Sequence, residues 1–137
     1  MIRRTVLLAG MLSLSLAACT SPQVRQATVE GDWALTSATL GGKELPLASF
    51  GGLLRLHGGN YVFQNDSGSY VLLEGNPRAM DVLGAQGPNA GKTIPAIYRL
   101  DGDAMTICYD LSGKARPVEF KSAAGTMQFL AVYARVQ

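Results

Sequence analysis

Short runs of β-branched and aromatic residues alternate along most of this chain with Gly, Asn, Asp and Pro, one run about every 8–12 residues. Turn sequences such as Gly41-Gly42, Gly58-Gly59-Asn60 and Asp101-Gly102-Asp103 separate these runs. Successive hairpins without long crossovers predict an all-β fold, and they favour an antiparallel up-and-down β-barrel of about eight strands over a sandwich. The expected strands cover 33–40, 53–57, 61–64, 70–74, 79–83, 93–100, 104–109, 118–121 and 127–136, with a short return at 44–45 and a turn of helix near 46–50.

The N-terminal segment has the pattern of a bacterial lipoprotein signal. Met1–Arg4 is cationic, residues 5–16 form an apolar run, and Leu16-Ala17-Ala18-Cys19 resembles a lipobox. The apolar run is too short to span a bilayer, which takes roughly 20 residues. We therefore expect a signal peptide over 1–18, lipidation of Cys19, a polar tether over 19–28 and one domain over 29–137. A soluble secreted protein cleaved after Ala18 is the alternative.

Lipidation would make the lipid bilayer a partner of the chain through the acylated Cys19. One acyl chain holds a protein only marginally, at about 0.8 kcal/mol per buried CH₂, whereas a diacylglycerol with a further chain such as palmitate anchors it stably. We expect an exported protein that is lipid-anchored at the cell envelope. Thr20 follows the cysteine in place of aspartate, which favours the outer membrane if the source is Gram-negative.

Charge and cysteine content exclude several classes of function. The chain has 12 Lys and Arg against 10 Asp and Glu, and removal of Arg3 and Arg4 with the signal leaves a mature chain with no net charge. A neutral domain lacks the electrostatic footprint of a nucleic-acid-binding protein, so we expect no nucleic-acid partner. Of the two cysteines, Cys19 is used for lipidation. Cys108 is then alone, and its apolar surroundings predict a buried structural thiol.

Several segments resemble one family of bacterial domains. They are Gly31-Asp32-Trp33 near the start of the domain, followed by 76–81, 91–94, 97–103, 107–108 and 116–122. In their order and spacing, over essentially all of 29–136, they resemble an uncharacterised, lipocalin-like family that is abundant in planctomycetes. The resemblance implies a lipocalin-like β-barrel. It implies no particular activity, because none is assigned to the family.

A lipocalin-like barrel also implies a particular pair of residues at its closed end. In such barrels a Gly-x-Trp on the first strand places the indole across the floor, and a basic residue from the last strand lies over it. Trp33 and Arg135 are the candidates in this chain. A guanidinium over an aromatic face contributes up to about 2 kcal/mol where it is desolvated. The pair is expected to be structural.

Nothing in the sequence favours an enzyme, a metal site or a cofactor. His57 is the sole histidine, and it precedes Gly58-Gly59 where a solvated turn is expected. The stretch Gly84–Lys92 has some likeness to a phosphate-binding loop. However, Gly91-Lys92-Thr93 leads into a strand instead of a helix, so we interpret it as a hairpin loop. We expect a protein without catalytic residues, metal or cofactor.

Two kinds of function remain open. The first is a ligand-binding barrel that takes a small apolar molecule, with a lining drawn from Tyr61, Phe63, Tyr70, Leu72, Tyr98, Met105 and Ile107. The same residues could instead fill a small barrel as core. The second is an envelope interaction or structural protein that uses the loops at 84–92 and 111–117. A void of a few hundred Å³ with an open mouth would favour the first, and a solid interior the second.

Overall fold

The computed structural model describes residues 28–137 of the chain. The expected signal peptide, Cys19 and all of the tether except Thr28 lie outside the described residues. Ten short elements follow one another. They are β1 (Gly31–Leu40), β2 (Lys43–Glu44), α1 (Leu47–Phe50), β3 (Leu53–His57), β4 (Asn60–Phe63), β5 (Asp66–Leu73), β6 (Arg78–Gln86), β7 (Thr93–Asp101), β8 (Ala104–Asp110) and β9 (Gln128–Arg135).

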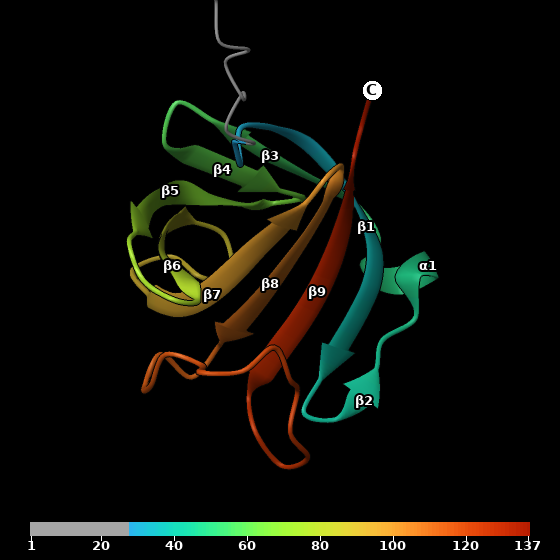
Figure 1. Cartoon of the computed structure of the whole chain (residues 1–137), viewed down its shortest axis with the longest axis vertical. Helices are drawn as coiled ribbons and strands as arrows, with labels where there is room; N and C mark the ends of the chain where they lie inside the picture. Colours follow the sequence, from blue (N-terminus) through green and yellow to red (C-terminus); the bar gives the residue numbers. More distant parts are fainter. Residues whose placement is uncertain (1–27) are drawn as a thin grey trace, which may run out of the picture.

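The strands form one antiparallel sheet that closes on itself. Strand order is β1-β3-β4-β5-β6-β7-β8-β9, and β9 pairs back onto β1. β2 pairs only with the end of β1 and is not one of the eight strands that form the barrel wall. The prediction of an eight-stranded, up-and-down barrel is confirmed (Figure 1). Pairing of β9 with β1 closes the sheet, so neither of these strands is left as an open edge along its whole length.

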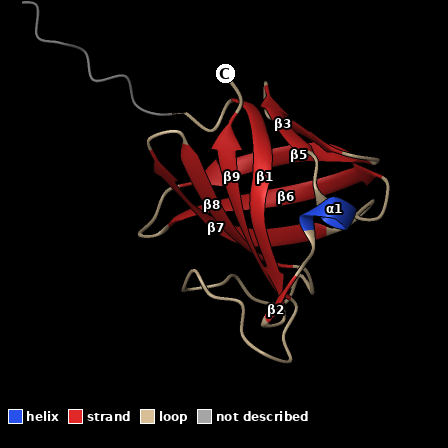
Figure 2. Cartoon of the chain, turned by 90° about the vertical axis from the view of Figure 1, so that its right-hand side faces the viewer, coloured by secondary structure: helices blue, strands red, loops and turns tan. Residues whose placement is uncertain are grey.

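β1 closes the barrel because it is long enough to pair with both β3 and β9. Residues 31–34 pair with β3, whereas residues 33–40 pair with β9. Beyond Ala34, β1 therefore has no partner on its β3 side until β2 pairs with Thr39 and Leu40. The segment that carries α1 lies next to this part of β1, outside the strands (Figure 2).

The two ends of the barrel are built from different connections. The β3–β4, β5–β6 and β7–β8 turns lie at the end where the chain enters β1 and leaves β9, which we call the floor. The β4–β5 turn, the β6–β7 loop and the 111–127 loop lie at the opposite end, together with the β1–β2 turn. We call this end the mouth. In Figure 1 the C-terminus lies at the top, and the 111–127 loop and the β1–β2 turn lie at the bottom.

Side chains alternate between the interior and the outer surface, as the period of two in a strand requires. In β3, Leu54 and Leu56 are buried while Leu53, Arg55 and His57 are exposed. The same alternation in the other strands builds one core inside the barrel. Its largest fully buried side chains are Trp33, Leu56, Met80, Met105 and Ile107.

The predicted strand at 118–121 is wrong. Asp110 of β8 pairs directly with Gln128 of β9, so a further strand has no place between them in a closed barrel. Residues 111–127 instead form a loop in which Val118 is 82 % exposed. β5 also begins earlier than the expected strand at 70–74, because Asp66 already pairs with Phe63 and the turn falls on Gln64 and Asn65.

The 111–127 loop folds back over the outer face of β6, β7 and β8. Asp110 begins it by accepting hydrogen bonds from the backbone N–H groups of Ser112, Lys114 and Ala115 at 3.0, 3.1 and 2.8 Å. Burial alone would raise the pKa of Asp110, but these bonds and one from the Ser112 hydroxyl outweigh burial and lower it. The loop is thus fixed by its first turn.

Arg116 fastens the middle of this loop to the barrel wall. Its Nη1 donates to the carbonyl oxygens of Met80 and Ala96 at 3.1 and 3.0 Å, and its Nη2 to Asp81 Oδ1 at 2.6 Å. Cys108 lies fully buried beneath the loop, with its thiol 3.4 Å from the Lys121 carbonyl oxygen. Burial raises the pKa of the Cys108 thiol, which lowers the fraction of the reactive thiolate.

Among the described residues, no helix has the length and apolar character needed to cross a membrane.

Candidate functional site

The floor is sealed by Trp33 and Arg135. These residues face each other in the β1–β9 register, and the Arg135 guanidinium carbon lies 4.2 Å from the centre of the indole ring. Trp33 is fully buried, and its Nε1 donates to the Val29 carbonyl oxygen at 2.9 Å. The indole therefore has its polar group satisfied and its face covered, which is the geometry of a structural plug.

Arg135 also holds the incoming chain against the floor. Its Nη1 donates to the Glu30 carbonyl oxygen at 2.7 Å and its Nη2 to the Thr28 carbonyl oxygen at 2.8 Å. The Glu30 side chain accepts from the Tyr70 hydroxyl at 2.7 Å and from the Gly58 N–H at 3.1 Å. These two hydrogen bonds lower the pKa of the Glu30 carboxyl. The chain thus enters the domain at the end away from the mouth.

Above the floor the barrel contains a cavity of about 330 Å³. Its deep wall includes Leu56, Met80, Ile94 and Ile107, each at most 3 % exposed. Its outer wall includes Phe50 of α1, which is 47 % exposed. Because one set of lining residues is buried and the other faces solvent, the cavity connects the barrel core with the outside at the mouth. A void of this size, walled mainly by apolar side chains, has the character of a small-molecule site.

Of the seven residues proposed as lining, four line the cavity and three do not. Tyr61, Phe63, Tyr70 and Ile107 do line the cavity. Three do not: Leu72 is 44 % exposed near the floor end of β5, and Met105 and Tyr98 are buried in the core. All three have the inward parity of their strands. Leu72 and Met105 lie toward the floor ends of β5 and β8, whereas Tyr98 pairs with Ile107 but borders a separate hollow near the β5–β6 turn.

Two tyrosines that were not among the expected lining residues meet inside the cavity. Tyr109 of β8 and Tyr133 of β9 both line it, and their hydroxyl oxygens lie 3.1 Å apart. Burial raises the pKa of Tyr133 to about 12 and raises that of Tyr109 well above its usual value. Tyr109 has the same parity as Ile107, so the alternation in β8 was a sufficient signal to include it.

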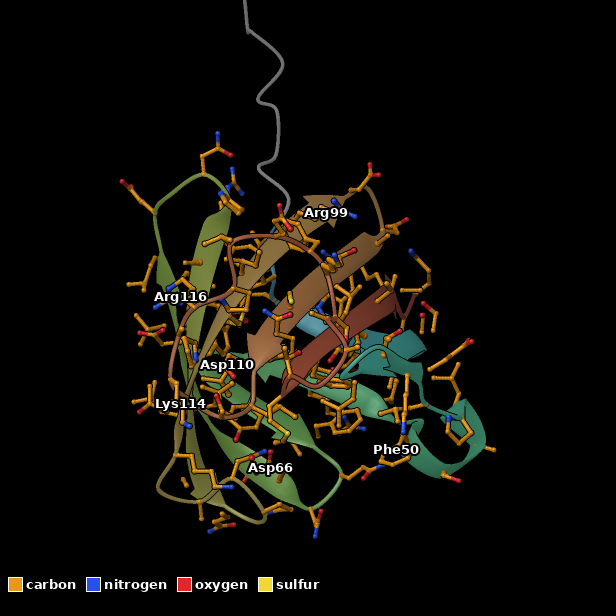
Figure 3. All side chains as sticks on the ribbon, turned by 90° about the horizontal axis from the view of Figure 1, so that it is seen from below. Phe50, Asp66, Arg99, Asp110, Lys114 and Arg116 are labelled. Atoms are coloured by element: carbon orange, nitrogen blue, oxygen red, sulfur yellow. The ribbon has the colours of Figure 1, made fainter. Side chains whose placement is uncertain are left out.

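The charged group nearest the cavity is Asp66, at the start of β5. It is the sole ionisable acid or base, tyrosines apart, among the described residues of the lining. Asn89 Nδ2 donates to its Oδ2 at 2.6 Å, and the Tyr61 hydroxyl donates to its Oδ1 at 3.3 Å. Burial and this carboxylate raise the pKa of Tyr61 to about 12. Figure 3 is viewed from the mouth side and shows Phe50, Asp66 and Asp110, which belong to α1, β5 and β8.

Of the remaining candidates from the sequence, His57 lies outside the cavity, whereas the stretch 84–92 contributes Pro88 and Asn89 to its lining. His57 ends β3 on the floor side, where its Nε2 lies 2.8 Å from Asp32 Oδ1 and its side chain is 63 % exposed. The stretch 84–92 forms the β6–β7 hairpin end, in which Gly84 and Lys92 share a backbone hydrogen bond. Within residues 28–137 no group of three or more His, Cys, Asp or Glu side chains is placed to hold a metal ion.

Comparisons of the chain with protein-family models, with curated proteins and with solved structures give no significant match.

Proposed function

We propose that this protein is an exported, lipid-anchored lipoprotein whose lipocalin-like barrel binds a small apolar molecule in the cavity above Trp33. The observation that carries the proposal is the void of about 330 Å³ that opens at the mouth and reaches the core. The interior of an eight-stranded barrel is just large enough either to be filled by side chains or to hold one small ligand. Here the side chains leave part of that interior empty.

The chemistry of the wall supports an apolar ligand. Desolvating apolar surface contributes about 25 cal/mol per Å², and the deep wall offers aliphatic and thioether surface from Met80, Ile94 and Ile107. A mainly apolar void binds hydrocarbons where the ligand is small enough. We place no reaction in the cavity. Tyrosine hydroxyls whose pKa values are raised to about 12 are poor bases near neutral pH, which supports a binding function without catalysis or cofactor.

The expected anchor gives the binding site an orientation. Thr28, the first described residue, lies at the floor, where Arg135 binds its carbonyl oxygen. A lipid on Cys19 would attach to this end of the domain through the short segment 19–27, and the mouth would then face away from the bilayer. The bilayer is the proposed partner through acylated Cys19, and the ligand would arrive from the aqueous side.

Calorimetric titration with butylbenzene tests ligand binding. Val82 is 8 % exposed and lines the cavity, so the larger side chain of Val82→Phe fills part of the void and should weaken butylbenzene binding at least 10-fold. Val71→Phe is the matched control, because Val71 is 48 % exposed on the neighbouring strand and does not line the cavity. The control should bind like the wild type. Equal binding by all three proteins, or no binding by a folded wild type, favours an envelope interaction protein with a filled barrel.

Detergent phase partition tests the anchor. Expressed in a bacterium with its signal intact, the wild type should enter the detergent phase and incorporate labelled palmitate. Cys19→Ser should remain in the aqueous phase with no label. Recovery of both proteins in the aqueous phase would overturn the lipoprotein assignment while leaving the cavity proposal unaffected.

A further inference from the structure

We propose that the ligand is uncharged and carries a hydrogen-bond acceptor, such as a carbonyl or ether oxygen, that is bound by the hydroxyl pair of Tyr109 and Tyr133. This inference rests on the proposed ligand-binding function. It adds a chemical class to a cavity whose wall is otherwise mainly apolar.

The first step is a count of hydrogens. Each tyrosine hydroxyl carries one O–H donor. In the contact of 3.1 Å between Tyr109 and Tyr133, one hydroxyl donates and the other accepts. The accepting hydroxyl keeps its own hydrogen, and this hydrogen has no acceptor among the described residues. The pair therefore always presents one free O–H donor, whichever of the two tyrosines supplies it.

The second step is the position of that donor. Both tyrosines line the cavity; Tyr133 is 3 % exposed, Tyr109 is half-buried, and the neighbouring Ile107 is fully buried. A buried polar group without a partner carries a free-energy cost relative to a satisfied one. A ligand oxygen in the cavity would remove that cost. A pure hydrocarbon would not.

The third step is the charge of the surroundings. No Lys, Arg or His of the described residues lines the cavity, and the carboxylate of Asp66 stands at its mouth. An anionic ligand would lose its hydration without gaining a counter-charge, and it would be repelled by Asp66. The acceptor is therefore a neutral oxygen and not a carboxylate or phosphate.

The fourth step is size. At about 30 Å³ for each water-sized group, a cavity of 330 Å³ accommodates about eleven non-hydrogen atoms. Suitable probes of this size are butylbenzene, the ketone butyrophenone and the anion 4-propylbenzoate. They differ mainly in the polar group that they bring into the same apolar space.

The experiment measures the affinity of these three probes for the wild type and for Tyr109→Phe/Tyr133→Phe. Replacing both partners with groups of the same shape is close to neutral for stability, so the double variant should fold. Its affinity for butyrophenone should fall between about 2-fold and 10-fold, while its affinity for butylbenzene stays equal or rises. Tyr98→Phe is the control, because Tyr98 is a buried tyrosine outside the cavity. This variant should behave as the wild type.

Infrared spectroscopy gives a readout that a purely structural role would not change. The carbonyl stretch of ¹³C-labelled butyrophenone should lie at a lower wavenumber when bound to the wild type than when bound to the double variant. Equal stretches, equal losses of ketone and hydrocarbon affinity, or binding of 4-propylbenzoate as tight as that of the ketone would each overturn the inference. If butylbenzene fails to bind the folded wild type, the proposed function itself is wrong and this inference fails with it.

Discussion

A Cβ atom on Gly31 would lie 2.9 Å from Nη1 of Arg135, closer than real side chains approach. Gly31 also has a φ of +132°, a conformation that side-chain-bearing residues rarely adopt. Glycine is therefore favoured at position 31 of the Gly-x-Trp sequence for two reasons. Its backbone has a positive φ, and the guanidinium that covers Trp33 leaves little space for a Cβ atom. The relationship explains why these three residues occur together at the floor.

Gly31→Ala should consequently destabilise the domain by about 2–3 kcal/mol, since the Arg135 guanidinium must shift and the backbone is strained. Urea unfolding at neutral pH measures the change. Gly102→Ala is a suitable comparison, because Gly102 has a φ of +58° but no atom near the position of a Cβ. That variant should lose only about 1 kcal/mol. Equal losses would mean that the contact with Arg135 contributes nothing.

Trp33→Ala should cost roughly 3–5 kcal/mol, because the indole is fully buried, hydrogen-bonded to Val29 and covered by Arg135. Thermal unfolding followed by circular dichroism measures this effect. A variant that melts at the wild-type temperature would show that the indole does not seal the floor.

Arg116→Ala should loosen the 111–127 loop and uncover Cys108. The side chain donates to two backbone carbonyls and to Asp81, so its loss should destabilise the domain by about 1–2 kcal/mol. In a Cys19→Ser background Cys108 is the remaining cysteine, and its reaction with a disulfide reagent reports exposure directly. The reaction should be at least 10-fold faster in the Arg116 variant. Lys114→Ala removes a cation whose backbone alone binds Asp110, so it serves as the control.

Alkaline pH should unfold this barrel through its tyrosines. Burial raises the pKa of Tyr61, Tyr70 and Tyr133 to about 12, while an unfolded tyrosine titrates near about 10. A folded pKa above the unfolded value gives stability that is complete below about pH 10 and is lost as the pH rises toward about 12. Unfolding by urea between about pH 8 and pH 11 should show this loss. Tyr109→Phe/Tyr133→Phe should have a shallower slope, and an unchanged slope would contradict the account.

The fold could be predicted from the sequence because its turns are strong local signals. Gly58-Gly59 and Gly102 all have positive φ in tight turns, and the strands between such turns alternate buried and exposed side chains. The error at 118–121 has a different origin. The β-propensity of residues 118–121 can be read from the local sequence. The lack of room for a further strand between Asp110 and Gln128 follows only from closure of the barrel.

The cavity was predictable only in part. Strand parity identifies inward residues such as Tyr61 and Ile107, but it does not say which inward residues meet an empty space. Met105 and Ile107 have the same parity in β8, yet only Ile107 lines the cavity because it lies closer to the mouth. The contact between Tyr109 and Tyr133 depends on the register of β8 against β9, which a single sequence does not supply.

Methyl NMR during a titration with butyrophenone tests the central claim most directly. Ile94 and Ile107 line the cavity. Ile97 of β7 is also buried, but it does not line the cavity. The account predicts saturable shifts for the methyl groups of Ile94, Ile107 and Met80, with Ile97 unchanged. A folded protein in which none of these methyl groups shifts, or in which Ile97 shifts as much as Ile107, would contradict it.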